Sequence, residues 1–291
     1  IYAVHNRPEG ASYIGEKEEF VSRAALPLTD VAVGPDGALY FTVGGRGTQS
    51  ALYRVTYVGD ASTEPADTRD AEGAELRRLR RRVEQFHRPG LITSQDSADL
   101  DFVFDCLGHD DRHIRLAARV ALEHQPIELW QDRVSESDES DRRIQGVVAL
   151  ARAGSLAFAD APGKRRQTQR AALATLEELE FSELTRRQRL DALRALALTF
   201  IRLGPPDVRQ STTVAARLIP HFPSDDLDVD QELARVLVYL NAPGVVQKCL
   251  DLMAKKYEIK PEATQALLSR NRGYGGTIAA MLANQPESQK L

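Results

Sequence analysis

The sequence is poor in cysteine and in aromatic residues. Its 291 residues include two cysteines, one tryptophan and 6% aromatic side chains, whereas hydrophobic residues make up 42%. Cys106 and Cys249 lie in separate helix-like segments, and such positions rarely meet in a linear helical repeat, so we expect no disulfide. A Cys-x-x-Cys-His motif, which attaches c-type haem, is absent from the sequence. This composition is typical of Ala- and Leu-rich helical repeats.

Long apolar runs and a strong excess of charge are also missing. No apolar run approaches the ~20 residues that a membrane-spanning helix needs, so we expect no transmembrane segment. The formal net charge is -4, which gives little reason to expect nucleic acid or an anionic membrane as the main partner. The chain begins at Ile1 in a strand-like stretch and stops at Leu291 just after a helix-like one. We therefore expect a fragment of a larger multidomain protein.

The spacing of apolar residues divides the chain into two regions. Over residues 1–59, short alternating stretches and Gly-rich turns predict strands at 28–34, 38–44 and 51–58, with further candidates at 1–5 and 19–22. This set is typical of about one four-stranded β-propeller blade. Residues 60–73 are polar and read as a linker. We therefore expect a terminal propeller blade over 1–59, a linker over 60–73 and a helical repeat domain over 74–291.

From residue 74 onward the apolar period changes to 3.6, with stripes such as the one from Leu76 to Val83 that predict amphipathic helices. An Asp-x-x-apolar motif recurs at Asp111, Asp141 and Asp230, and we expect each Asp to cap a helix. The spacing leaves room for the ~40–47-residue units of HEAT repeats. The predicted fold is mostly α, a HEAT-type α-solenoid preceded by a small antiparallel β piece.

Cys106, His109 and His113 have a spacing that suggests a metal site. A structural zinc site needs four ligands, and no fourth ligand is near in the sequence. The segment 108–111 reads more naturally as a turn between two helices, with Cys106 in the core and His109 in solvent. We therefore expect no metal site, with these three residues as the only candidates.

The densest basic feature includes Arg77, Arg78 and Arg81. Helical repeats can bind duplex DNA along a basic face, so nucleic-acid binding through these three residues is an alternative function. Acidic residues in the same segment and the negative net charge favour a solvated helix face instead. The other basic pairs, at 142–143, 165–166 and 186–187, are mostly expected to open helices beside acids.

Arg46 lies in the Gly-rich loop 44–47 and is the one candidate for contact with a cofactor. The loop lies between two predicted strands, whereas a phosphate-binding loop is followed by a helix, so a propeller turn is the better interpretation. No nucleophile–base–orienter set is apparent, and we predict no catalytic residue.

The run Leu-Thr-Asp-Val-Ala-Val-Gly-Pro-Asp-Gly-Ala-Leu-Tyr-Phe-Thr-Val-Gly-Gly-Arg-Gly at 28–47, followed by 52–57, resembles the final blade of a sorbosone- or glucose-dehydrogenase-like propeller. The whole arrangement resembles the large "membrane-bound dehydrogenase" type proteins of planctomycetes and verrucomicrobia. In these, HEAT repeats follow the propeller and precede a haem-c domain, and residues 271–284 resemble the part before the haem region. The resemblance implies an extracytoplasmic redox parent that carries haem c.

Together these patterns predict a non-catalytic scaffold that holds a propeller domain and a haem domain in fixed geometry. Its expected partners are the neighbouring domains of the parent chain, and another protein along the solenoid groove. No cofactor is expected in this region itself. The alternatives are a nucleic-acid-binding helical repeat and a part of a quinoprotein sugar or alcohol oxidoreductase whose site includes Arg46.

Overall fold

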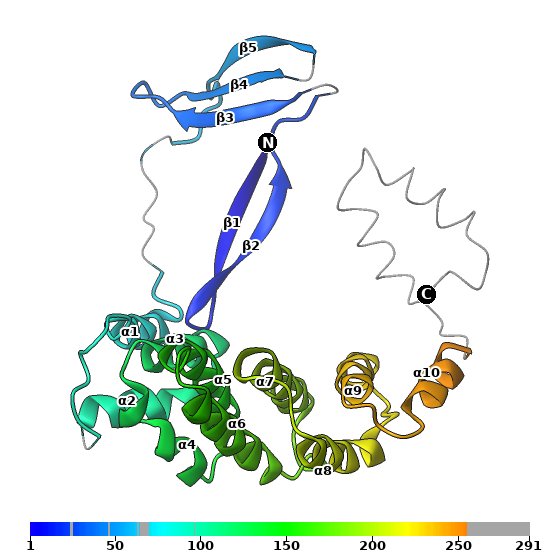
Figure 1. Ribbon diagram of the computed structural model, residues 1–291. Coiled ribbons are helices and arrows are strands. Elements are labelled where there is room, and N and C mark those ends of the chain that lie inside the picture. The colour runs from blue at the N-terminus through cyan, green and yellow to red at the C-terminus, as the bar shows by residue number, and fades with distance from the viewer. Residues whose placement is uncertain (24–25, 46, 63, 65–69, 96, 255–291) are drawn as a thin grey trace. The chain divides into compact units, whose positions relative to one another are not determined.

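The computed structural model describes residues 1–254 except 24–25, 46, 63, 65–69 and 96. Within this part of the chain, helices dominate and two small antiparallel sheets precede them (Figure 1). The prediction of a mostly α chain with a small β piece is therefore confirmed. Backbone contacts divide the chain into two compact units. The first unit comprises residues 1–180 and 198–204, and the second comprises 181–197 and the described residues from 205 onward.

The β strands form two sheets rather than one blade. β1 (Tyr2–Glu9) and β2 (Ser12–Glu19) pair as a hairpin, while β3 (Leu28–Val33), β4 (Leu39–Gly45) and β5 (Thr48–Val55) form a sheet in that order. The predicted strands at 28–34, 38–44 and 51–58 are confirmed within a few residues. The candidate at 19–22 is wrong, because the strand lies at 12–19 instead. Its second half is densely charged and lacks the apolar alternation that predicts a strand.

The predicted four-stranded sheet is not found among the described residues. β3, β4 and β5 are held by their own contacts, including rings of Phe41 and Tyr53 whose centroids lie 4.9 Å apart. At the tight turn between β3 and β4, the Asp36 carboxylate accepts hydrogen bonds from the Tyr40 hydroxyl at 2.8 Å and from Arg54 Nη2 at 2.9 Å. This turn is the one that Gly-Pro-Asp-Gly predicts.

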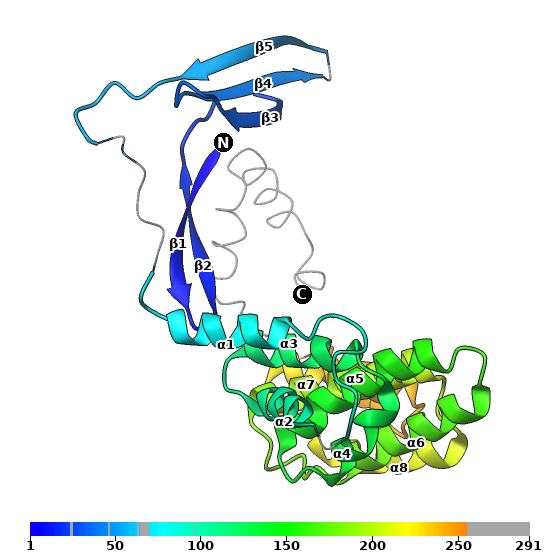
Figure 2. The same cartoon turned by 90° about the vertical axis from the view of Figure 1, so that its left-hand side faces the viewer.

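The helices of the first unit alternate between two layers. α1 (Ala74–Glu84), α3 (Arg112–Glu123) and α5 (Ser140–Ala157) pack in that order, and Figures 1 and 2 show them side by side. The second layer consists of α2 (Ala98–Asp105), α4 (Gln131–Glu136) and α6 (Pro162–Glu177), which lie along one side of the layer formed by α1, α3 and α5. The 3-10 turns η1 (Cys106–Gly108) and η2 (Ile127–Leu129) complete the unit. Its core includes wholly buried Leu100, Leu107, Ile114, Leu122, Trp130 and Ile144.

The second unit follows the same pattern of short helices and polar caps. α7 (Arg186–Leu203) has its first part in this unit, followed by α8 (Val208–Leu218), η3 (Ile219–His221), α9 (Leu227–Tyr239) and α10 (Val245–Ala254). α9 packs against both α8 and α10 through its apolar face, which includes buried Leu233 and Leu237. No described helix in either unit has the length and apolar character that a bilayer span requires.

The recurring Asp motif marks helix starts but caps only one helix. Asp111 is the N-cap of α3, as predicted. The capping prediction is wrong for Asp141, which is buried inside the first turn of α5, and for Asp230, which lies one turn into α9. The Asp230 carboxylate instead accepts the Ser224 backbone N–H at 2.6 Å, and Asp226 caps the helix. The motif therefore predicts where a helix starts, but it does not predict which residue caps that helix.

Candidate functional site

The three candidate metal ligands do not form a cluster. Cys106 is buried and free, and burial raises the pKa of its thiol to about 11, so the metal-binding thiolate is disfavoured. His109 Nδ1 accepts the backbone N–H of Asp111 at 2.9 Å, in the turn that precedes α3. His113 belongs to the first turn of α3. Within the described residues, no group of three or more His, Cys, Asp or Glu side chains is placed to hold a metal ion.

The three arginines of the nucleic-acid alternative do not share an open surface. Arg77 is only 7% exposed and donates to the carbonyl oxygen of Asp70 at 2.7 Å. Arg78 is exposed and lies 3.6 Å from the Glu75 carboxylate, and Arg81 is exposed near the end of α1. A phosphate backbone therefore has access to two of the three residues. Arg46 and the segment 271–284 lie outside the described residues.

The turn of the β1–β2 hairpin is anchored to the N-terminal end of α3. The Ala11 N–H donates to Asp111 Oδ2 at 2.7 Å, while the backbone N–H groups of His113 and Ile114 donate to Asp111 Oδ1 at 2.8 and 3.2 Å. Burial works to raise the pKa of Asp111, but these three donors outweigh it and hold the pKa below its usual range. One carboxylate thus caps a helix and binds a strand turn 100 residues away in sequence.

Two glycines and an arginine complete this anchor. Gly10 has φ of 55°, and a Cβ atom there would lie 2.0 Å from Asp111 Oδ2. Gly73, just before α1, has φ of 66°, and a Cβ atom there would lie 2.6 Å from the Gly10 carbonyl oxygen. The Arg77 guanidinium lies 4.7 Å from the centre of the Tyr13 ring on the same hairpin. These contacts, called the hairpin anchor below, fix β1 and β2 to α1 and α3.

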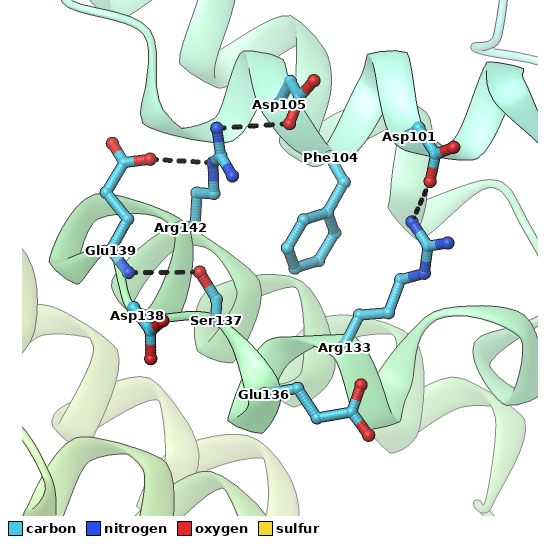
Figure 3. Close-up of a pocket in the computed structure, with 9 residues that line it drawn as sticks. All are labelled: Asp101, Phe104, Asp105, Arg133, Glu136, Ser137, Asp138, Glu139 and Arg142. Carbon is cyan, nitrogen blue, oxygen red and sulfur yellow. Dashed lines mark hydrogen bonds and ion pairs between the residues drawn. The ribbon is translucent and has the colours of Figure 1, made fainter.

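A pocket of about 650 Å³ opens between α2, α4 and the start of α5 (Figure 3). Phe104, which is 7% exposed, lies between two arginines in the close-up. The rest of the lining is mainly charged, with five carboxylates and two guanidinium groups. The lining residues are Asp101, Phe104, Asp105, Arg133, Glu136, Ser137, Asp138, Glu139 and Arg142.

Both arginines of the pocket are committed to carboxylates of the pocket. Arg133 pairs with Asp101, and Arg142 lies 3.2 Å from Asp105 and 2.8 Å from Glu139. By contrast, Glu136 and Asp138 are exposed and make no ion pair within the described part of the chain. The carboxylates of Glu136 and Asp138 therefore leave the pocket with a net negative charge, which favours binding of a cationic group.

Sequence reasoning missed both the pocket and the hairpin anchor. The pocket combines residues from three helices, and only the stretch Glu-Ser-Asp-Glu at 136–139 gives a local signal of it. The hairpin anchor joins Ala11 to Asp111, a long-range contact that no local pattern indicates.

Comparisons with known proteins add no relative: no protein-family model matches the chain, and neither a curated protein nor a solved structure matches it.

Proposed function

We propose that this chain is a non-catalytic scaffold, a HEAT-type helical repeat that holds its N-terminal β segment and a further domain in fixed geometry. In such arrays each unit contacts only its neighbours, which produces a stiff support. The packing order α1, α3, α5 in one layer of the first unit, and the contact of α4 with α6 in the other, support this proposal.

Polar contacts between neighbouring helix pairs give the proposal further support. Side chains contact residues of the next or the preceding pair of helices at sequence separations from 26 residues, between Lys248 and Phe222, to 42 residues, between Arg186 and Asp228. The upper end of this range reaches the ~40–47 residues of a HEAT unit. The contacts pair Gln125 with Phe86 and Arg88, Arg133 with Asp101, Gln169 with Gly204, and Arg186 with Asp226.

The hairpin anchor is the observation that carries the proposal. A flexible connection between a β segment and a helical domain would need no buried contact, whereas here Ala11 is wholly buried and donates to a partly buried carboxylate. Ordering these groups costs conformational entropy, which an anchor offsets through its contacts. The parts so held would be the propeller and haem-c domains of an extracytoplasmic, dehydrogenase-like parent, on the resemblance described above.

Spin labels test whether the hairpin is held rigidly. With Cys249→Ser as background, labels at Lys17→Cys on β2 and Leu116→Cys on α3 report the distance between two exposed positions. We expect one narrow distance distribution by pulsed electron paramagnetic resonance. Gly10→Ala should broaden it, because the new Cβ displaces the Asp111 carboxylate.

Gly37→Ala is the matched control for this experiment. Gly37 also has a positive φ, 75°, but a Cβ there meets no atom within 4 Å. It therefore introduces backbone strain without touching the hairpin anchor, and the distribution should stay narrow. A broad distribution in the unsubstituted chain would contradict a rigid scaffold, and oxidation of a sugar or alcohol by this chain with a quinone would contradict its non-catalytic character.

A further inference from the structure

The N-terminal half of α6 carries four cations that form no ion pair within the described part of the chain. Its first turn contains no acidic residue, although the N-terminal end of a helix carries partial positive charge and disfavours cations. Within the described residues none of its four cations forms an ion pair, and Lys164 Nζ has only the Phe158 ring, whose centre is 5.6 Å away. The pair at 165–166 lies near the start of a helix, as predicted, but the expected acids are missing from the first turn of that helix. The four residues are Lys164, Arg165, Arg166 and Arg170.

The opposite charge lies at the other end of the same pair of helices. α5 and α6 pack against each other, and Arg143 near the start of α5 lies 2.8 Å from Glu178 just after α6, so the two helices are antiparallel. The 18 residues of α5 span about 27 Å at 1.5 Å per residue. The acidic pocket lies at the start of α5, and the four cations lie in the N-terminal half of α6, with Arg170 near its middle. The α5–α6 pair is therefore acidic at one end and basic at the other.

We propose that two copies of this chain associate antiparallel along the α5–α6 pair. The basic N-terminal half of α6 in one copy then faces the acidic pocket of the other, and a twofold axis makes the two contacts equivalent. Glu136 and Asp138, which are exposed and make no ion pair with the described residues, accept the guanidinium groups of Arg166 and Arg170. The inference is independent of the scaffold proposal, since it concerns charged side chains of α6 and of the pocket and not the hairpin anchor.

A second copy suits these surfaces better than a nucleic acid does. A phosphate backbone would meet the four cations but also the carboxylates of a chain whose net charge is -4. A second copy instead supplies a partner of opposite sign for both ends at once. Exposed ion pairs are individually weak and screened by salt, so the association should depend strongly on ionic strength.

Sedimentation equilibrium of the full chain tests the association. We expect a dimer at about 50 mM salt and a dissociation constant at least ~10-fold weaker at about 500 mM, because the Debye length shortens severalfold. The variant Arg166→Glu/Arg170→Glu should be monomeric, and so should Glu136→Arg/Asp138→Arg. Arg81→Glu, a reversal at an exposed position of α1, is the matched control and should dimerise like the unsubstituted chain.

Mixing the two reversed variants provides the decisive step. Arg166→Glu/Arg170→Glu carries acidic groups at both ends of the α5–α6 pair, whereas Glu136→Arg/Asp138→Arg carries basic groups at both ends. A 1:1 mixture of the two variants should therefore form a heterodimer. A chain that stays monomeric at low salt would overturn the proposal, as would reversed variants that still dimerise or a mixture that does not. Binding of a duplex DNA oligonucleotide that Arg166→Glu/Arg170→Glu abolishes, without dimerisation, would assign the basic surface to nucleic acid instead.

Discussion

Asp111 connects two secondary structures that are remote in sequence. Its Oδ1 accepts the first free N–H groups of α3, and its Oδ2 accepts the N–H of Ala11 in the β1–β2 turn. A backbone N–H buried without an acceptor costs free energy comparable to a lost hydrogen bond. Removal of this carboxylate therefore affects the helix cap and the hairpin together.

We expect Asp111→Ala to reduce the free energy of unfolding by about 1–2 kcal/mol at pH 7, the usual cost of losing an N-cap. The depressed pKa of Asp111 means that its ionised form stabilises the folded state above the unfolded pKa of about 3.9. This stabilisation is lost as the pH falls through the lower folded pKa. Urea titrations at neutral and acidic pH should therefore show a difference between variant and native chain that shrinks on acidification.

Asp207→Ala is the control for this substitution. Asp207 caps α8 through a reciprocal capping box with Gln210, so its hydrogen bonds in the described structure are local to the start of that helix. Both variants should lose stability, but only Asp111→Ala should speed exchange of the Ala11 amide proton. Equal protection of that amide in the native chain and in Asp111→Ala would contradict the role given to Asp111.

At the scale of secondary structure elements, the Asp36 side chain stabilises the β3–β4 turn, in which the Gly-Pro-Asp-Gly sequence favours an Asp at this position. Hydrogen bonds from Arg54 and then from the Tyr40 hydroxyl lower the pKa of Asp36 to about 2. The carboxylate therefore stays ionised, and the ion pair with Arg54 persists, throughout the moderately acidic range. This pairing links the turn to β5, which lies on the far side of β4.

We predict that Arg54→Gln raises the pKa of Asp36 toward its ordinary value, because the largest cause of the shift is removed. The change is measurable as the midpoint of the Asp36 carboxyl carbon shift in an NMR titration. Arg7→Gln on β1 serves as the control, since Arg7 pairs with Glu16 and belongs to the other sheet. An Asp36 midpoint that Arg54→Gln leaves near 2 would contradict this assignment.

The sequence predicted those elements whose stability comes from local pattern. β3 and β4 follow from alternating apolar residues around a Gly-Pro-Asp-Gly turn, and α3 follows from an Asp cap and an apolar stripe. β2 escaped prediction because its second half carries charges on both faces and is stabilised by pairing with β1. The acidic pocket escaped prediction because its residues meet only when α2, α4 and α5 pack.

At the scale of the whole molecule, each unit is stabilised by contacts between neighbouring helices, such as α1 with α3 and α8 with α9. Ile114 of α3 lies in the core of the first unit and Leu233 of α9 in the second, and both are wholly buried. In the helical repeat that we propose, stability is the sum of unit and nearest-neighbour terms, so a local defect stays local. The local sequence pattern indicates helices in both units, but it does not indicate how energy is shared between them.

The most direct test of the proposed helical repeat is hydrogen exchange of the full chain, carrying either Ile114→Ala or Leu233→Ala. Each substitution removes a buried side chain at a cost of about 2–5 kcal/mol. We expect Ile114→Ala to lower amide protection in α3 and its neighbours α1 and α5 while α9 keeps its protection, and Leu233→Ala to lower it in α8, α9 and α10 while α3 keeps its own. Loss of protection throughout both units from either substitution would show one cooperative domain and contradict the repeat account.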